Sequence, residues 1–177
     1  MTQPTRTEVT TPTQFTTLRP ETPAPTTATG SPAPSYPVPD DWLTHMDPVL
    51  GFSLRYPPDL VLHDLTGPSP QGGLRERTLD FRAPGTQLRA FALSVIGSFR
   101  DGISLEDWAW ESAGCTRESI HQSTLDSVPA VRCTREVYGD FREPAIVSEH
   151  GGRMFLISGI GLSEIEFDRV FGSFKFG

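Results

Sequence analysis

The sequence predicts an α+β domain built on an antiparallel β-sheet, and two observations support this prediction. The stretch 51–60 places Phe52, Leu54 and Tyr56 at alternate positions with polar residues between them, which is typical of a half-buried strand. Further strand patterns are grouped before and between two helix patterns. This grouping favours an α+β fold over a doubly wound one.

The chain divides into an N-terminal segment, residues 1–37, and a domain, residues 38–177. The first 37 residues include 12 Thr and 8 Pro and few large apolar side chains. Such a segment buries too little apolar surface to offset the entropy lost on ordering it, so we expect a disordered linker. The rest of the chain is long enough to form a full hydrophobic core.

Strand patterns recur through the domain. We expect strands at the ranges 52–56, 60–62, 75–81, 88–96, 119–125, 128–138, 145–149 and 153–160. The stretch 88–96 is apolar at both parities, which predicts a central strand covered on both faces. Asp126-Ser127 and Gly151-Gly152 are the expected turns of two hairpins. Residues 38–48 are expected to form the lead-in to the domain, with Trp42 at the edge of the core.

Two helices are predicted from their N-terminal caps. Ser104 and Ser163 are each followed three residues later by an acid, Asp107 and Glu166, and apolar residues occupy the staple positions. The first helix is expected to extend to about residue 113 and to stop at Gly114. The second helix has one apolar stripe, expected to face the sheet. It consists of Phe167, Val170, Phe171 and Phe174.

The net charge of −7 belongs to the domain, because the two Arg and two Glu of the first 37 residues cancel. An acidic domain repels phosphate backbones and anionic bilayers, so nucleic acids and membrane surfaces are not expected partners. No apolar run has the length of a membrane span, and the first residues do not resemble a signal peptide. We therefore expect membrane attachment only through a signal or lipid anchor preceding residue 1.

The two cysteines, Cys115 and Cys133, allow two interpretations. Beside a Thr/Pro-rich stalk, which suits a cell-surface spacer, they favour one disulfide formed in an oxidising compartment. The alternative is two ordinary buried thiols in a cytosolic protein, since two cysteines alone are weak evidence. A disulfide would connect the end of the first helix to the strand expected at 128–138.

Four stretches of the domain resemble the PsbP-like (Mog1/PsbP) superfamily. They are GFSLRYPPDL at 51–60, SLEDW at 104–108, VPAVR at 128–132 and FGSFKF at 171–176. In the same order, they are similar to the family patterns GFSFxYPxxW, sleew, G-x-pA-x-r and ilxSFkF. Leu60 and Ser127 depart from the family, which usually has Trp and often has Gly at these positions.

The resemblance covers residues 42–176 and implies an α/β/α sandwich around an antiparallel sheet. It also implies a binding or accessory protein, because members are mostly of this kind and many are bacterial lipoproteins. It implies no catalytic residue, because the matched positions are those of the core and the turns.

Two residue pairs, His63-Asp64 and Glu149-His150, are the best candidates for acid–base or metal chemistry. Neighbouring side chains of a strand point to opposite faces, so neither pair can chelate one ion by itself. A site would need both pairs to converge, and nothing in the spacing requires this. We interpret them as solvated residues of a loop and of strand ends.

The other candidate motifs have structural explanations. The acidic pair Glu106-Asp107 falls in the first turn of a helix, where the helix dipole favours acids. Gly159-Ile160-Gly161 lies between a strand and a helix, as a phosphate loop would, but Glu164 replaces the third glycine of a dinucleotide-binding loop. No serine or cysteine has the context of a nucleophile. We predict no catalytic residue, cofactor or metal site.

The function expected from the sequence is a non-catalytic binding or accessory domain outside the cytoplasm, tethered to the cell envelope by the Thr/Pro-rich stalk. Its partner would be a protein or a small ligand at the envelope, and we expect a monomer. A small extracytoplasmic hydrolase or ligand-processing enzyme with a sheet-edge site is the alternative, and a structural envelope component is a third possibility. Converging His and carboxylate groups in a groove would favour the enzyme, whereas an exposed apolar patch would favour the binding domain.

Overall fold

The computed structural model describes residues 36–66, 75–97, 102–137, 141–159 and 161–177. Most of the expected linker, residues 1–35, therefore lies outside the described residues. The elements of the described part are β1 (Leu43–Asp47), β2 (Phe52–Tyr56), β3 (Val61–Asp64), β4 (Arg75–Arg82), β5 (Arg89–Gly97), α1 (Leu105–Glu111), the 3-10 helix η1 (Arg117–Ser119), β6 (His121–Leu125), β7 (Val128–Val137), β8 (Phe141–His150), β9 (Arg153–Ser158), α2 (Glu164–Gly172) and β10 (Lys175–Phe176).

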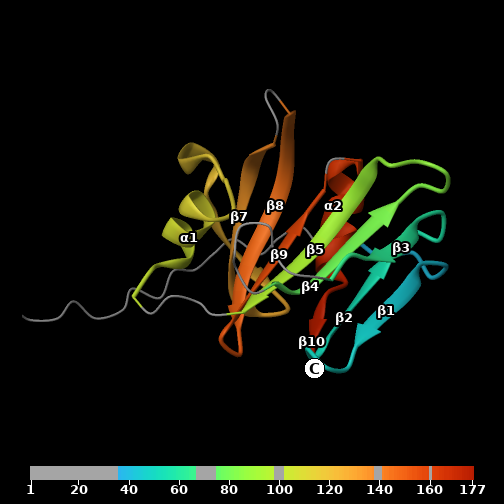
Figure 1. The fold of residues 1–177 in the computed structure, drawn as a ribbon, viewed down its shortest axis with the longest axis horizontal. Coiled ribbons are helices and arrows are strands. Elements are labelled where there is room, and N and C mark those ends of the chain that lie inside the picture. Colours follow the sequence, from blue (N-terminus) through green and yellow to red (C-terminus); the bar gives the residue numbers. More distant parts are fainter. Residues whose placement is uncertain (1–35, 67–74, 98–101, 138–140, 160) are drawn as a thin grey trace, which may run out of the picture.

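The strands form two antiparallel sheets (Figure 1). The larger sheet has seven strands in the order β3-β4-β5-β9-β8-β7-β6, and the smaller has three in the order β1-β2-β10. Strand β5 pairs with β4 on one side and β9 on the other, which confirms the central position predicted from its apolar pattern. The α+β class with an antiparallel sheet is also confirmed.

The large sheet is covered on both faces, and β9 shows why. Its side chains alternate between two cores: Phe155 and Ile157 pack on one side, and Met154 and Leu156 on the other. The first core contains the apolar stripe of α2 and residues of the small sheet, and the second contains one face of α1. The two helices therefore lie on opposite faces (Figure 1), as the α/β/α expectation requires.

Both predicted helix caps are present. The Ser104 hydroxyl accepts a hydrogen bond from the Asp107 amide, and Ser163 and Glu166 form a complete capping box. Helix α1 is shorter than expected: it ends at Glu111, and Gly114 follows with a φ of 77°. In the described part of the chain, no helix has the length and apolarity that crossing a membrane requires.

Three expected element boundaries were wrong, each because a tertiary contact decides the structure. Part of the lead-in 38–48 is strand β1, which pairs along its whole length with β2. Strand β8 begins at Phe141 rather than 145, because its ladder with β7 continues through Pro144 to the Val137–Phe141 pair. Ser119 belongs to η1 and not to a strand, and its hydroxyl accepts the Thr134 amide in place of a ladder bond.

An arginine joins the small sheet to the large one. Arg77 on β4 contacts the buried Asp47 of β1 through its Nε at 2.8 Å, and Asp64 of β3 through Nη1 at 2.9 Å. A second arginine holds the lead-in, because Nη2 of Arg55 donates to the carbonyl oxygens of Pro39, Asp40 and Trp42. The Trp42 side chain is buried, as predicted.

Candidate functional site

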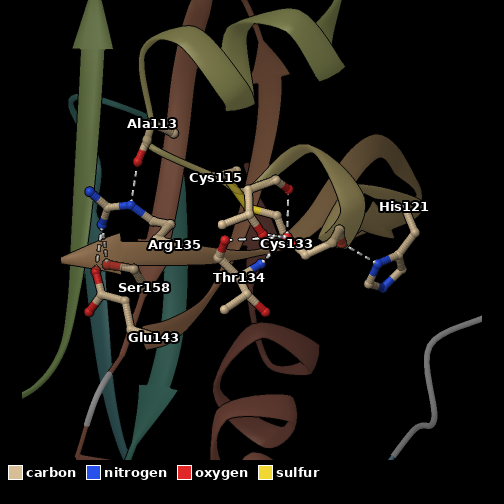
Figure 2. Close-up of a disulfide and its surroundings, with 10 residues drawn as sticks. Ala113, Cys115, His121, Cys133, Thr134, Arg135, Glu143 and Ser158 are labelled. Atoms are coloured by element: carbon tan, nitrogen blue, oxygen red, sulfur yellow. Dashed lines mark hydrogen bonds and ion pairs between the residues drawn. A yellow bond between two sulfur atoms is a disulfide. The ribbon is translucent and has the colours of Figure 1, made fainter. Parts of the chain in front are cut away.

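Cys115 and Cys133 form a disulfide, with their Cα atoms 5.8 Å apart (Figure 2). This confirms the disulfide that the first of the two interpretations predicted. Both residues are buried in the core beneath α1, where Trp108 and Val131 also pack. The bond connects the segment that follows α1 to the middle of β7 and fits an oxidising compartment.

Several hydrogen bonds join the same segment to β7. The Thr116 amide donates to the Thr134 carbonyl, and the Glu136 amide donates to the Gly114 carbonyl. Nε of Arg135 donates to the Ala113 carbonyl, as Figure 2 shows. The disulfide is thus one of several connections in a buried region, which is the environment of a structural bond rather than a reactive one.

Beside the disulfide, a fully buried carboxylate binds two arginines. Glu143 on β8 is 0% exposed, and its Oε1 lies 2.6 Å from Nη1 of Arg135, its register partner on β7. Its Oε2 lies 3.0 Å from Nη2 of Arg89, at the start of β5. Nη1 of Arg135 also donates to Oγ of Ser158 at 3.0 Å. The three charged side chains form an ion triad across the end of the sheet.

The sequence pattern did not reveal this triad, because Glu143 lies outside the strands expected at 128–138 and 145–149. One signal could have revealed it. Arg135 follows Val131 and Cys133 at the same parity of the strand expected at 128–138, so it shares a face with two apolar side chains. An arginine on such a face requires a carboxylate partner, so a nearby acid should have been sought.

A groove opens next to Arg89. It has a volume of about 310 Å³, and three connections form its walls. The loop between β2 and β3 contributes Pro57, Asp59 and Leu60, the β4–β5 hairpin contributes residues from Ala83 to Ala90, and the start of α2 contributes Leu162 and Glu166. Because these connections are far apart in the sequence, no single motif could have predicted the groove.

Two glycines allow the segment before α2 to pack closely against the start of β5, so that two walls of the groove lie in contact. A Cβ at Gly161 would lie 2.9 Å from the Ala90 Cα, and one at Gly159 would lie 2.8 Å from the Phe91 Cβ. The Gly161 amide donates to the Ala90 carbonyl at 3.0 Å. The glycines of the 159–161 turn are therefore required for close packing, which agrees with their interpretation as a strand-to-helix turn; Ile160 lies outside the described residues.

The groove is largely apolar, with charged residues at its margin. Leu60 and Ala90 are buried, whereas Leu88 is 79% exposed. The charged lining residues are Arg89, Asp59 and Glu166. The Ser163 hydroxyl and the Ser163 amide both donate hydrogen bonds to the Glu166 carboxylate. These bonds, chiefly the one from the hydroxyl, lower the pKa of Glu166. Glu166 is therefore bound to its own helix cap.

The two His/acid pairs lie in different parts of the large sheet. His63-Asp64 is on the edge strand β3, whereas Glu149-His150 ends β8, and three strands separate β3 from β8. At the usual strand spacing, this places the two strands about 19 Å apart. The structure does not bring the two pairs together. Among the described residues, no group of three or more His, Cys, Asp and Glu could hold a metal ion.

Each pair has local partners instead. Asp64 accepts hydrogen bonds from the Thr66 hydroxyl and amide and from Arg77, and the Thr66 bonds are the main reason that its pKa is lowered. Glu149 accepts the Gly152 amide at 2.7 Å within the β8–β9 turn. The His150 ring stacks on Phe176, with their centroids 4.1 Å apart. These contacts stabilise strand ends.

Comparison with solved structures establishes the fold. The solution structure of cyanobacterial PsbP (CyanoP) from Synechocystis sp. PCC 6803 matches with a TM-score of 0.52 at 19% identity, over 77% of this chain and 92% of that one. The chain has a PsbP-like fold. A crystal structure from Bacteroides thetaiotaomicron VPI-5482 matches with a TM-score of 0.50 at 14% identity, over 76% of this chain and 48% of that one, so the match spans about half of that protein. No protein-family model and no curated protein matches the sequence.

The stretches that resemble the PsbP-like family build the core of the fold, as expected. Phe52, Leu54, Trp108 and Phe174 are all buried. The first stretch has a second role, because its last residues, Pro57 to Leu60, form one wall of the groove. Leu60 stands where the family pattern has Trp. Leu60 lines the groove and is smaller than the Trp of the family pattern that the sequence resembles.

Proposed function

We propose that this protein is a non-catalytic binding or accessory domain that acts outside the cytoplasm and binds its partner through the groove. The proposal rests mainly on one observation: three connections converge to form a concave, largely apolar surface that leaves Leu88 exposed. Ligand sites are typically concave and apolar with a few polar groups. We further propose that residues 1–37 tether the domain to the cell envelope and that it acts as a monomer on a small ligand.

The disulfide supports the location of this function. Cys115 and Cys133 are bonded, and such bonds persist in oxidising compartments and are rare in the cytosol. The acidic net charge of −7 supports a partner other than a nucleic acid. A tether would suit a domain that must reach its ligand, because a tethered domain explores a large volume.

The proposal is tested by a broad panel of hydrolase substrates and by metal titration on the purified full chain. We expect no turnover and no stoichiometric metal binding. We also expect the fourfold variant His63→Ala, Asp64→Ala, Glu149→Ala and His150→Ala to remain folded, with the small stability changes typical of surface sites. Turnover or metal binding that this variant abolishes would contradict the proposal and favour the extracytoplasmic hydrolase.

A further inference from the structure

The guanidinium in the groove wall has unused hydrogen-bonding capacity. In the described part of the chain, only Nη2 of Arg89 has a partner, the Glu143 carboxylate, with its oxygens at 3.0 and 3.3 Å. A guanidinium has five N–H donors, and the Arg89 side chain is 32% exposed. Nε and Nη1 have no partner among the described residues, and Arg89 is one of the residues that line the groove.

The contacts behind this wall hold the arginine in place. Arg89 and Arg135 both contact the carboxylate of Glu143. Glu143 is completely buried, so its carboxylate has a fixed position and holds the Arg89 guanidinium at the end of the sheet. A preorganised arginine in a partly dry groove binds a carboxylate strongly, because charge-assisted bonds gain strength away from water.

The acids at the margin limit which anion can bind. Asp59 is exposed, and Glu166 is hydrogen-bonded to Ser163, so neither neutralises Arg89 through a direct contact in the described structure. Their negative charges lie along the same groove and would repel a phosphate or a dicarboxylate. A ligand with one carboxylate beside Arg89 and an uncharged remainder uses the spare donors of Arg89 and adds no further charge near Asp59 and Glu166.

We infer that the groove binds a small apolar molecule with a single carboxylate, which Arg89 holds while the apolar part lies on Leu60, Leu88 and Leu162. This inference rests on the proposed binding function. A volume of about 310 Å³ is at the small end of the range of ligand pockets, about 300–1,000 Å³. This size suits a free small acid rather than a segment of a polypeptide.

Titrations of the 15N-labelled full chain with hexanoate, hexanamide and hexylamine test the inference at neutral pH and low ionic strength. Amide shifts around the groove report binding, and the Arg89 Nε–H signal reports contact with the carboxylate. We expect hexanoate to shift both signals and to bind at least about tenfold more tightly than hexanamide, because a charge-assisted pair is lost in the amide. Inorganic phosphate should not compete.

Variants separate the role of Arg89 from general electrostatics. Arg89→Gln should reduce hexanoate binding to the level of hexanamide, and Arg89→Lys should retain part of it, because a lysine keeps the charge but not the planar fork. The control is Arg142→Gln, which removes an arginine that is 66% exposed in a surface pair with Glu136. This control should bind hexanoate like the wild type. If Arg89→Gln does not fold, the three wild-type titrations and the Nε–H signal still show whether Arg89 binds the carboxylate.

The outcomes distinguish this inference from the proposed function. If hexanoate and hexanamide bind the groove equally, or hexylamine binds best, the carboxylate inference is wrong and the binding function stands. If hexanoate shifts only amides outside the groove, the carboxylate inference and the proposed binding through the groove are both wrong. Tighter hexanoate binding that persists in Arg89→Gln would also overturn the assignment to Arg89.

Discussion

Replacing Glu143 with alanine should lower the free energy of unfolding by about 3–5 kcal/mol, because it leaves two buried or half-buried arginines without their carboxylate. Glu143 is 0% exposed and contacts Arg135 at 2.6 Å and Arg89 at 3.0 Å. A typical domain has a total stability of about 5–15 kcal/mol, so the variant should be close to unfolding. Urea denaturation of the full chain measures the change.

Two further variants separate charge from packing. Glu143→Gln keeps the size of the side chain and should lose nearly as much stability, since both arginines keep their charge. Glu136→Ala is the matched control on the neighbouring strand, because Glu136 pairs with Arg142 at 3.4 Å while 54% exposed. It should change stability by no more than about 0.5 kcal/mol. Equal losses in Glu143→Ala and Glu136→Ala would show that the triad does not stabilise the fold.

Removing the disulfide should cost about 3 kcal/mol, which is the chain-entropy value for a loop of this length. The two cysteines are separated by 18 positions in the sequence. The double variant Cys115→Ala and Cys133→Ala should therefore unfold at a lower urea concentration than the wild type. Because α1 packs against the same core, its amides should also lose protection against hydrogen exchange.

The control for this prediction is the effect of a reductant. A reductant should lower the urea midpoint of the wild type toward that of the variant and leave the variant unchanged. Mass spectrometry of the unreduced wild type should show a molecule two hydrogens lighter than the reduced form. If both thiols of the native, unreduced protein react with an alkylating agent, the prediction and the argument for an oxidising compartment both fail.

The sequence predicted the fold well where local pattern and tertiary structure agree. The caps at Ser104 and Ser163 form as their spacing indicated, and the apolar stripe of α2 is buried. Strand β1 was missed because its side chains, LTHMD, show no clear alternation, and its pairing with β2 defines it. Such pairing is a long-range property that local propensity does not encode.

The candidate site was much less predictable. Its walls come from three connections, and Arg89 is defined as a binding group only by the buried Glu143 behind it, 54 residues later in the chain. The sequence directed attention to His63, Asp64, Glu149 and His150, because titratable residues are visible in a sequence. A concave surface lined mostly by leucine, alanine, proline and glycine has no such signature.

The central claim, that the groove is the binding site, is tested most directly by mapping ligand binding onto the structure. A library of small neutral, anionic and cationic fragments is screened by amide shifts against the wild type and Leu60→Trp. This substitution introduces the residue of the PsbP-like pattern that the sequence resembles, so we expect the variant to fold while the larger side chain fills the groove. We predict that the wild-type amide shifts cluster at the groove, at Asp59 and Leu60 and around Leu88 and Leu162, and that Leu60→Trp abolishes them. Shifts that cluster instead at His63 or at the β8–β9 turn, or that persist in Leu60→Trp, would contradict the account.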